Sequence, residues 1–86
     1  MNPRLLEVIS SSIRAVSKRT QTMTITADSL LVEDLALDSL DLVGVLMKLE
    51  DHYQLSIEVD EIPNLKTVSD LGAQIETLLG DRTAAA

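Results

Sequence analysis

Residues 37–41, Leu-Asp-Ser-Leu-Asp, open the strongest helical pattern in the chain. Asp38 is a favourable N-cap, and Asp41 three residues later completes a capping box in which Asp replaces the usual Glu or Gln. Ser39 is then the first helical residue, with its hydroxyl expected to point outward. The apolar residues that follow share one face of a predicted helix over residues 39–52: Leu42, Val45, Leu46, Leu49 and Tyr53.

Two other segments have helical periodicity. In residues 4–18, one face carries Leu5, Ile9, Ile13 and Val16, with Asn2 as the expected N-cap and Pro3 at the first helical position. A second capping pattern, Thr67 with Asp70, precedes a face formed by Val68, Leu71, Ile75, Leu78 and Leu79. Gly80 is expected to end this last helix.

The remaining segments predict connections and a tail. Residues 19–37 show no sustained helical face, so we expect a long ordered loop anchored by Met23, Ile25, Leu30, Leu31 and Leu35. A short third helix is predicted at Val59–Asn64, limited by Pro63. Residues 1–80 should form one domain and residues 81–86 a flexible tail. These elements predict an all-α, four-helix bundle with three long helices and one short third helix.

Composition limits the chemistry that the chain can perform by itself. Its 86 residues suffice for one small domain, and Tyr53 is the only aromatic residue although 45% of residues are hydrophobic, so the core must be aliphatic. Without cysteine, the chain has no disulfide, no thiolate nucleophile and no Cys-based metal site. No signal peptide or membrane span is recognisable, so we expect a cytoplasmic protein.

Charge is distributed unevenly along the chain. Residues 1–27 carry four basic side chains and one acid, whereas residues 28–61 carry ten acids and a single lysine, Lys48. The net charge is therefore +3 in the first segment and −9 in the second. An acidic surface of this kind repels nucleic acid and attracts proteins with basic binding sites. We therefore expect no nucleic-acid partner.

A catalytic or metal site is not predicted from the residues present. The only histidine, His52, is thirteen helical residues from Ser39, a distance of roughly 20 Å, which is too far for a catalytic pair. The acids between Asp28 and Asp41 lack the central glycine of an EF-hand loop. We expect no resident metal and no catalytic residue.

The run LALDSLDLVGVLMKLEDHY resembles the central segment of the acyl carrier proteins, and the resemblance extends over residues 5–79. In that family the Asp-Ser-Leu motif carries 4'-phosphopantetheine on its serine, which corresponds to Ser39. The resemblance implies that a phosphopantetheinyl transferase attaches the group from coenzyme A. The terminal thiol of the group would then carry acyl intermediates of fatty-acid, lipid or polyketide biosynthesis as thioesters. The chain would be a carrier and not an enzyme.

The same resemblance implies roles for other residues. Asp38 and Leu40 match the neighbours of the modified serine, while Asp41, Glu50 and Asp51 match acidic positions of the helix that docks onto basic patches of acyl-loading enzymes, condensing enzymes and acyltransferases. A monomer is expected. Many family members have an acid in place of Gly44 and a neutral residue in place of Lys48, so both differences weaken the negative charge of the helix.

The acyl chain of such carriers is sheltered between helices, and the matching residues here are Val45, Leu49, Tyr53, Ile57, Leu65, Leu71 and Ile75. For most of these positions, ordinary core packing explains the residue equally well. Tyr53 is more polar, and Leu71 bulkier, than the residues frequent at these positions in the family. Both differences favour a shorter or more polar cargo.

Two other interpretations remain open at this point. An aminoacyl or peptidyl carrier uses the same attachment chemistry and a related motif. An unmodified helical module that binds a basic partner through its acidic helix would also show these patterns, because Asp and Ser are common at helix starts for capping alone.

Overall fold

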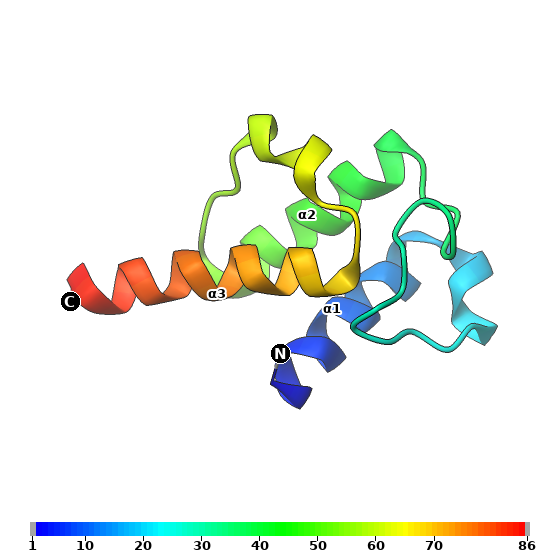
Figure 1. Ribbon diagram of the computed structural model, residues 1–86, viewed down its shortest axis with the longest axis horizontal. Helices are drawn as coiled ribbons and strands as arrows, with labels where there is room; N and C mark the ends of the chain where they lie inside the picture. The colour runs from blue at the N-terminus through cyan, green and yellow to red at the C-terminus, as the bar shows by residue number, and fades with distance from the viewer. Residues whose placement is uncertain (1, 86) are drawn as a thin grey trace.

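The chain forms three α-helices and two short 3₁₀ helices, in a computed structural model that describes residues 2–85 and their side chains except those of Val59 and residues 81–85. In order, these are α1 (Pro3–Val16), η1 (Lys18–Thr22), α2 (Ser39–Tyr53), η2 (Val59–Asn64) and α3 (Val68–Ala85), as Figure 1 shows. Within residues 2–85, β pairing is limited to one isolated bridge between Leu30 and Thr67. The predicted all-α class is thereby confirmed.

The expected count of four α-helices is confirmed only in part. The segment Val59–Asn64 is a 3₁₀ helix, because Pro63 supplies no backbone donor and short segments favour the tighter winding. Helix α1 ends at Val16, two residues before its predicted end, and a further 3₁₀ helix, η1, begins at Lys18 and occupies the start of the segment predicted as loop. The prediction that Gly80 ends the last helix was wrong: the described helix continues to Ala85, and Gly80 does not adopt a positive φ. The mobility of residues 81–86 stays a prediction.

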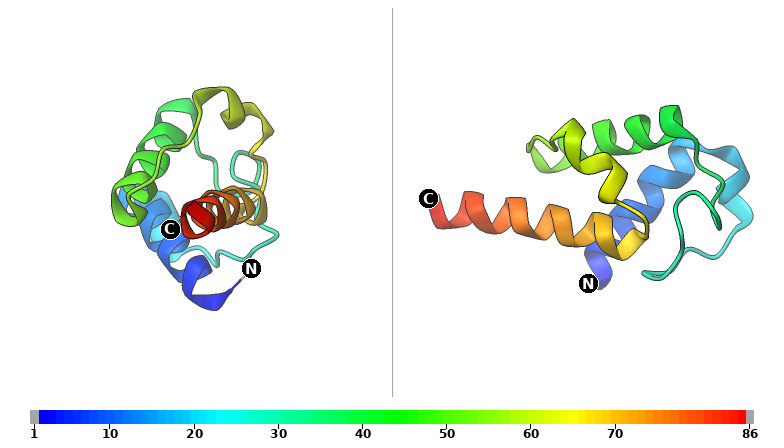
Figure 2. Two further views of the ribbon diagram at one scale, coloured as in Figure 1. Left: turned by 90° about the vertical axis from the view of Figure 1, so that its left-hand side faces the viewer. Right: turned by 45° about the horizontal axis from the view of Figure 1, so that its top comes forward.

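Helix α1 packs against both α2 and α3, and its first turn forms as expected. The Asn2 Oδ1 atom accepts hydrogen bonds from the backbone N–H groups of Arg4 at 2.8 Å and Leu5 at 3.0 Å, and Pro3 occupies the first turn. At its other end the helix stops at Val16, where Ser17 becomes extended. In the left view of Figure 2, α3 is seen end-on, and α1 and α2 lie on one side of it.

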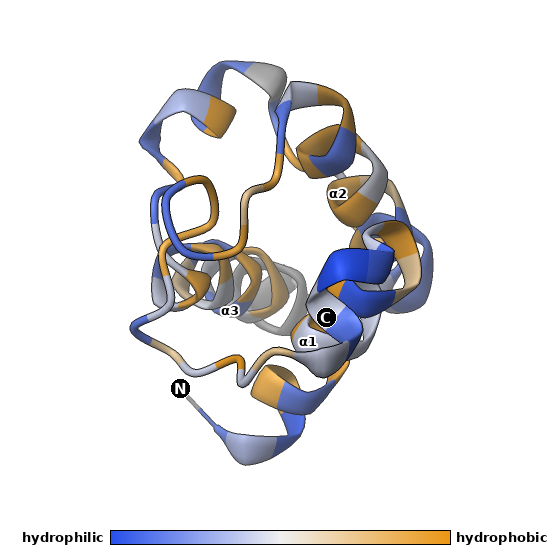
Figure 3. Cartoon of the chain, turned by 90° about the vertical axis from the view of Figure 1, so that its right-hand side faces the viewer, coloured by the Kyte–Doolittle hydropathy of each residue, from blue (hydrophilic) through white to orange (hydrophobic). Residues whose placement is uncertain are grey.

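The core lies where these three helices meet the long connection. Among the described side chains, fifteen buried aliphatic residues form one cluster, and Figure 3 shows hydrophobic positions along every helix that contributes to it. Helices α2 and α3 have little direct backbone contact with each other. Side chains such as Leu49 and Ile75, both fully buried, lie in the core between helices instead.

The connection between η1 and α2 is ordered by backbone hydrogen bonds to the start of α3. The N–H of Leu31 donates to the Lys66 carbonyl at 2.8 Å, and the N–H groups of Val68 and Ser69 donate to the carbonyls of Ser29 at 3.0 Å and Ala27 at 2.8 Å. Of the five predicted anchors, Ile25, Leu31 and Leu35 are buried, whereas Met23 and Leu30 are half-buried. Leu37, which sequence analysis did not name as an anchor, is also buried.

Asp70 secures the first turn of α3. Its Oδ2 atom accepts from the N–H groups of Lys66 and Thr67, each at 3.0 Å, and its own N–H donates to Thr67 Oγ1 at 3.0 Å. The hydrogen bonds from Lys66 and Thr67 lower the pKa of Asp70 below its ordinary value. The predicted Thr67 and Asp70 capping pair is confirmed.

We expect the Asp70→Asn variant to be less stable than the native chain at pH 7, by no more than about 1 kcal/mol because the carboxylate is only partly buried. A lowered folded-state pKa means that the carboxylate stabilises the fold above the unfolded pKa of about 4 and loses this effect as pH falls through the folded value. The two unfolding free energies should therefore converge below about pH 4. Urea unfolding between pH 3 and pH 7 measures this, and a constant gap would contradict it.

Gly44 lies inside α2 and faces the end of α1. A β-carbon at this position would lie 3.4 Å from both methyl carbons of Val16, which is ordinary van der Waals contact with a side chain. The helices are thus near each other here, but their packing does not require glycine.

We therefore expect Gly44→Ala to stabilise the protein by about 0.5–1 kcal/mol, since alanine is the better helix former. Thermal melting followed by circular dichroism measures the gain. Gly80→Ala is the matched reference, because its new methyl group would meet nothing within 4 Å. A lower melting temperature for Gly44→Ala alone would show that Val16 cannot accommodate the methyl group.

Candidate modification site at the start of α2

The turn before α2 brings the chain to the helix through a residue with unusual backbone geometry. Ala36 has a φ of 55°, in the left-handed region that residues other than glycine rarely adopt. Hydrogen bonds from the N–H of Ala36 to the Val32 carbonyl and from the N–H of Leu37 to the Leu31 carbonyl, both 3.0 Å, hold this turn. Buried Leu37 then fixes the direction from which the helix starts.

The first turn of α2 forms the predicted capping box. Asp38 Oδ1 accepts from the N–H of Asp41 at 2.8 Å, and Asp41 Oδ2 accepts from the N–H of Asp38 at 3.2 Å. Both carboxylates are therefore used to hold the helix terminus. Within the chain, the structural role of both carboxylates is to hold the start of α2.

Ser39 occupies the first helical position and is exposed to solvent. Its hydroxyl makes no hydrogen bond to any residue that the structure describes. A helix start also offers unpaired backbone N–H groups and partial positive charge, which suit a phosphate group. Ser39 is thus fixed in place, accessible and chemically free, as an attachment residue must be.

An exposed apolar stripe runs along α2 from this serine. It consists of Leu40, 79% exposed, Val43, 41% exposed, and Met47, 62% exposed, spaced i, i+3 and i+7. Large apolar side chains on one exposed face are typical of surfaces that bind other proteins. Of the three, only Leu40 was predicted from the sequence to contact a partner. Val43 and Met47 lie outside the predicted buried face of the helix, and this position alone could have identified them as exposed.

The other acids of α2 have different surroundings. Glu50 Oε2 accepts from the N–H of Ile57 at 2.8 Å and so fixes the chain that leaves the helix. Asp51 is exposed and borders two surface grooves, one toward α1 and one toward Leu55 and Leu78. Of the two, Asp51 is the more accessible to a partner, and the docking role expected for both stays a prediction.

Comparison with known proteins gives this site its context. A family model described as phosphopantetheine attachment site matches residues 5–75, which is most of the chain. The chain belongs to this family. Its cofactor, phosphopantetheine, supplies a thiol that the cysteine-free chain lacks.

Relatives and a solved structure agree with the family. The chain is 45% identical over 53 residues to an acyl carrier protein of Exiguobacterium sibiricum, covering 62% of this chain and 67% of the relative. It is 38% identical over 56 residues to an acyl carrier protein of Akkermansia muciniphila, covering 65% and 70%. A solved Mycobacterium tuberculosis structure, provisionally described as an acyl carrier protein, aligns with a TM-score of 0.76 at 32% identity, covering 85% of this chain and 96% of its own.

The residues expected to shelter an acyl chain all belong to the core of this family member. Six of the seven are buried: Val45, Leu49, Ile57, Leu65, Leu71 and Ile75. Tyr53 is half-buried and packs against the same cluster. Burial raises the pKa of the Tyr53 hydroxyl above its ordinary value, while the Arg4 charge opposes this rise. Core packing accounts for all seven, and their role around cargo stays a prediction.

His52 is in the last turn of α2, at the opposite end from Ser39, with its ring edge-on to Tyr53 at a centroid distance of 4.7 Å. Among the side chains that the structure describes, no group of three or more His, Cys, Asp or Glu residues is arranged to hold a metal ion. Of the described helices, none is sufficiently long and apolar to cross a membrane.

Proposed function

We propose that this chain is an acyl carrier protein in which Ser39 carries 4'-phosphopantetheine. The observation that carries the proposal is an exposed, unbonded serine hydroxyl at the first position of a helix held by a reciprocal capping box. Membership of the phosphopantetheine attachment site family supports it, as do the names of the relatives.

In this proposal, a separate transferase brings coenzyme A to the helix start. The Ser39 hydroxyl forms a new bond to the phosphorus of the phosphopantetheine group, its proton passes to a base of the transferase, and 3',5'-ADP leaves. Bound phosphopantetheine supplies a thiol for thioester formation. The chain contributes position and access, and catalysis belongs to the enzymes that it visits.

The surface beside Ser39 fits partners that have an apolar patch bordered by basic side chains. Leu40, Val43 and Met47 provide the apolar part, and the net charge of −9 over residues 28–61 provides the electrostatic attraction. Asp51 is the accessible acid at the far end of the helix, and Asp38 and Asp41 border its start. The chain is proposed to act as a cytoplasmic monomer.

The separation of α2 from α3 favours acyl cargo. These two helices have little direct backbone contact. The side chains between them can therefore move to admit an acyl chain without breaking a close helix–helix contact. Leu71 and the hydroxyl of Tyr53 limit the space, so a short or moderately polar acyl group is the proposed cargo.

Intact-mass measurement tests this function in two stages. The chain is first incubated with coenzyme A and a broad-specificity phosphopantetheinyl transferase, and we expect one added phosphopantetheine. The modified protein is then offered to acyl-loading enzymes and, separately, to amino-acid-activating enzymes. Loading by the second class alone would favour an aminoacyl carrier, and no modification in the first stage would favour an unmodified interaction module.

A further inference from the structure

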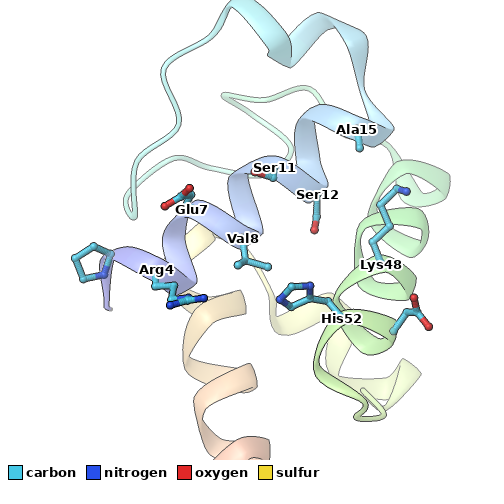
Figure 4. A pocket seen from close by; sticks show the side chains of 10 residues that line it. Arg4, Glu7, Val8, Ser11, Ser12, Ala15, Lys48 and His52 are labelled. Atoms are coloured by element: carbon cyan, nitrogen blue, oxygen red, sulfur yellow. The ribbon is translucent and has the colours of Figure 1, made fainter.

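A groove of about 790 Å³ lies between α1 and α2, and its lining includes Asp51 but neither Ser39 nor the apolar stripe of α2. Figure 4 shows Arg4, Val8, Ser11 and Ala15 along α1, opposite Lys48 and His52 of α2. The half-buried Val8 provides an apolar surface, and the hydroxyl of Ser11 offers a hydrogen-bonding group beside it. The groove therefore combines charged, polar and apolar contacts.

Cations from both helices face this groove. Arg4 and Lys48 are exposed and form no ion pair with any residue in the described part of the chain. Lys48 is also the only lysine or arginine in residues 28–61, and it lies on the side of α2 that faces basic α1. Two acids, Glu7 and Asp51, also border the groove, but Figure 4 shows that the Glu7 carboxylate points away from α2.

The spacing of the charges favours an extended occupant. Along α1 the groove reaches from Pro3 to Ala15, which corresponds to roughly 18 Å of helix. Arg4 lies toward one end and Lys48 toward the other, as Figure 4 shows. A single small anion cannot contact both ends, whereas about five or six residues of extended peptide match this length.

We infer that the groove between α1 and α2 binds an extended acidic segment of a partner protein, through Arg4, Lys48 and His52. This surface is separate from the start of α2, and Arg4 and Lys48 give it positive side chains that the acidic start of the helix lacks. A partner that engages both surfaces would be held in one orientation, since reversing it would oppose like charges.

A labelled peptide tests the inference with the full chain and without cofactor, so the result does not depend on modification of Ser39. The probe is a fluorescein-labelled six-residue peptide that alternates Glu and Leu, and the control probe replaces each Glu by Gln. We expect binding of the acidic probe by fluorescence polarisation, with affinity that falls as salt rises. Backbone amide shifts in NMR spectra should concentrate on residues that line the groove, such as Val8, Ser11 and Lys48.

Reversal of two groove charges, in the Arg4→Glu and Lys48→Glu double variant, should weaken binding at least tenfold. The matched control is the Lys18→Glu and Arg19→Glu double variant, which makes the same change in net charge at exposed residues of η1. The control should retain affinity within about twofold, and circular dichroism verifies the fold of both variants.

Three results would overturn the inference. They are equal loss in the two double variants, equal binding of the Gln probe, and amide shifts that lie outside the groove. Inorganic phosphate provides a further arm: if phosphate produces the groove shifts while the acidic peptide produces none, the groove is a small-anion site and not a docking surface.

Discussion

Replacing Ser39 by alanine should abolish the addition of phosphopantetheine completely. The hydroxyl oxygen is the atom that would bond to phosphorus, and alanine has no atom that can replace it. The fold should persist, because the capping box uses Asp38 and Asp41 and the serine hydroxyl makes no bond within the described residues. Intact mass after incubation with coenzyme A and transferase measures the effect, with circular dichroism to verify folding.

Ser69 offers a matched control for this experiment. It is also an exposed serine in the first turn of a helix, α3, and it lies between the two residues of a capping pair, Thr67 and Asp70. Ser69→Ala should be modified to the same extent as the native chain. A mass increase that persists in Ser39→Ala, or that disappears in Ser69→Ala, would assign the attachment to another residue.

Truncation of Leu31 to alanine should remove much of the stability of the domain. Leu31 lies in the connection before α2 but is fully buried, and truncating such a leucine costs about 2–5 kcal/mol. Domains of this size are stable by only about 4–13 kcal/mol. We expect the melting temperature to fall by at least about 10 °C.

The next residue along the chain provides the comparison. Val32 is 54% exposed, so Val32→Ala should change stability by no more than about 0.5 kcal/mol. Urea unfolding of both variants measures the difference. Similar losses in the two variants would mean that the connection does not insert Leu31 into the core.

The helices and the candidate site could be predicted from sequence because both depend on local signals. Asn2, Asp38 and Thr67 mark helix starts by bonds that span only a few residues, and all three starts were found. Ser39 at the first helical position follows from the same capping box. The buried face of α2 also follows from periodicity, with Val45, Leu46 and Leu49 all buried.

The features that sequence analysis missed are those that a local sequence pattern does not decide. The end of α3 was placed at Gly80 because glycine often terminates helices, but a glycine can also continue a helix at moderate cost. The 3₁₀ winding of η2 reflects its short length and Pro63, and the sequence pattern indicated a short helix there without distinguishing its winding. The groove beside Arg4 and Lys48 needs two helices to be placed against each other, which no local pattern specifies.

The hydrogen bonds between the connection and the start of α3 can form only late in the synthesis of the chain. Residues 27–31 of the connection are bonded to residues 66–69, which the ribosome adds well after Ser39. A nascent chain that lacks this later segment cannot form these three hydrogen bonds. A transferase that contacts residues 27–31 as well as the helix start would meet the final arrangement of both only after residues 66–69 have been made.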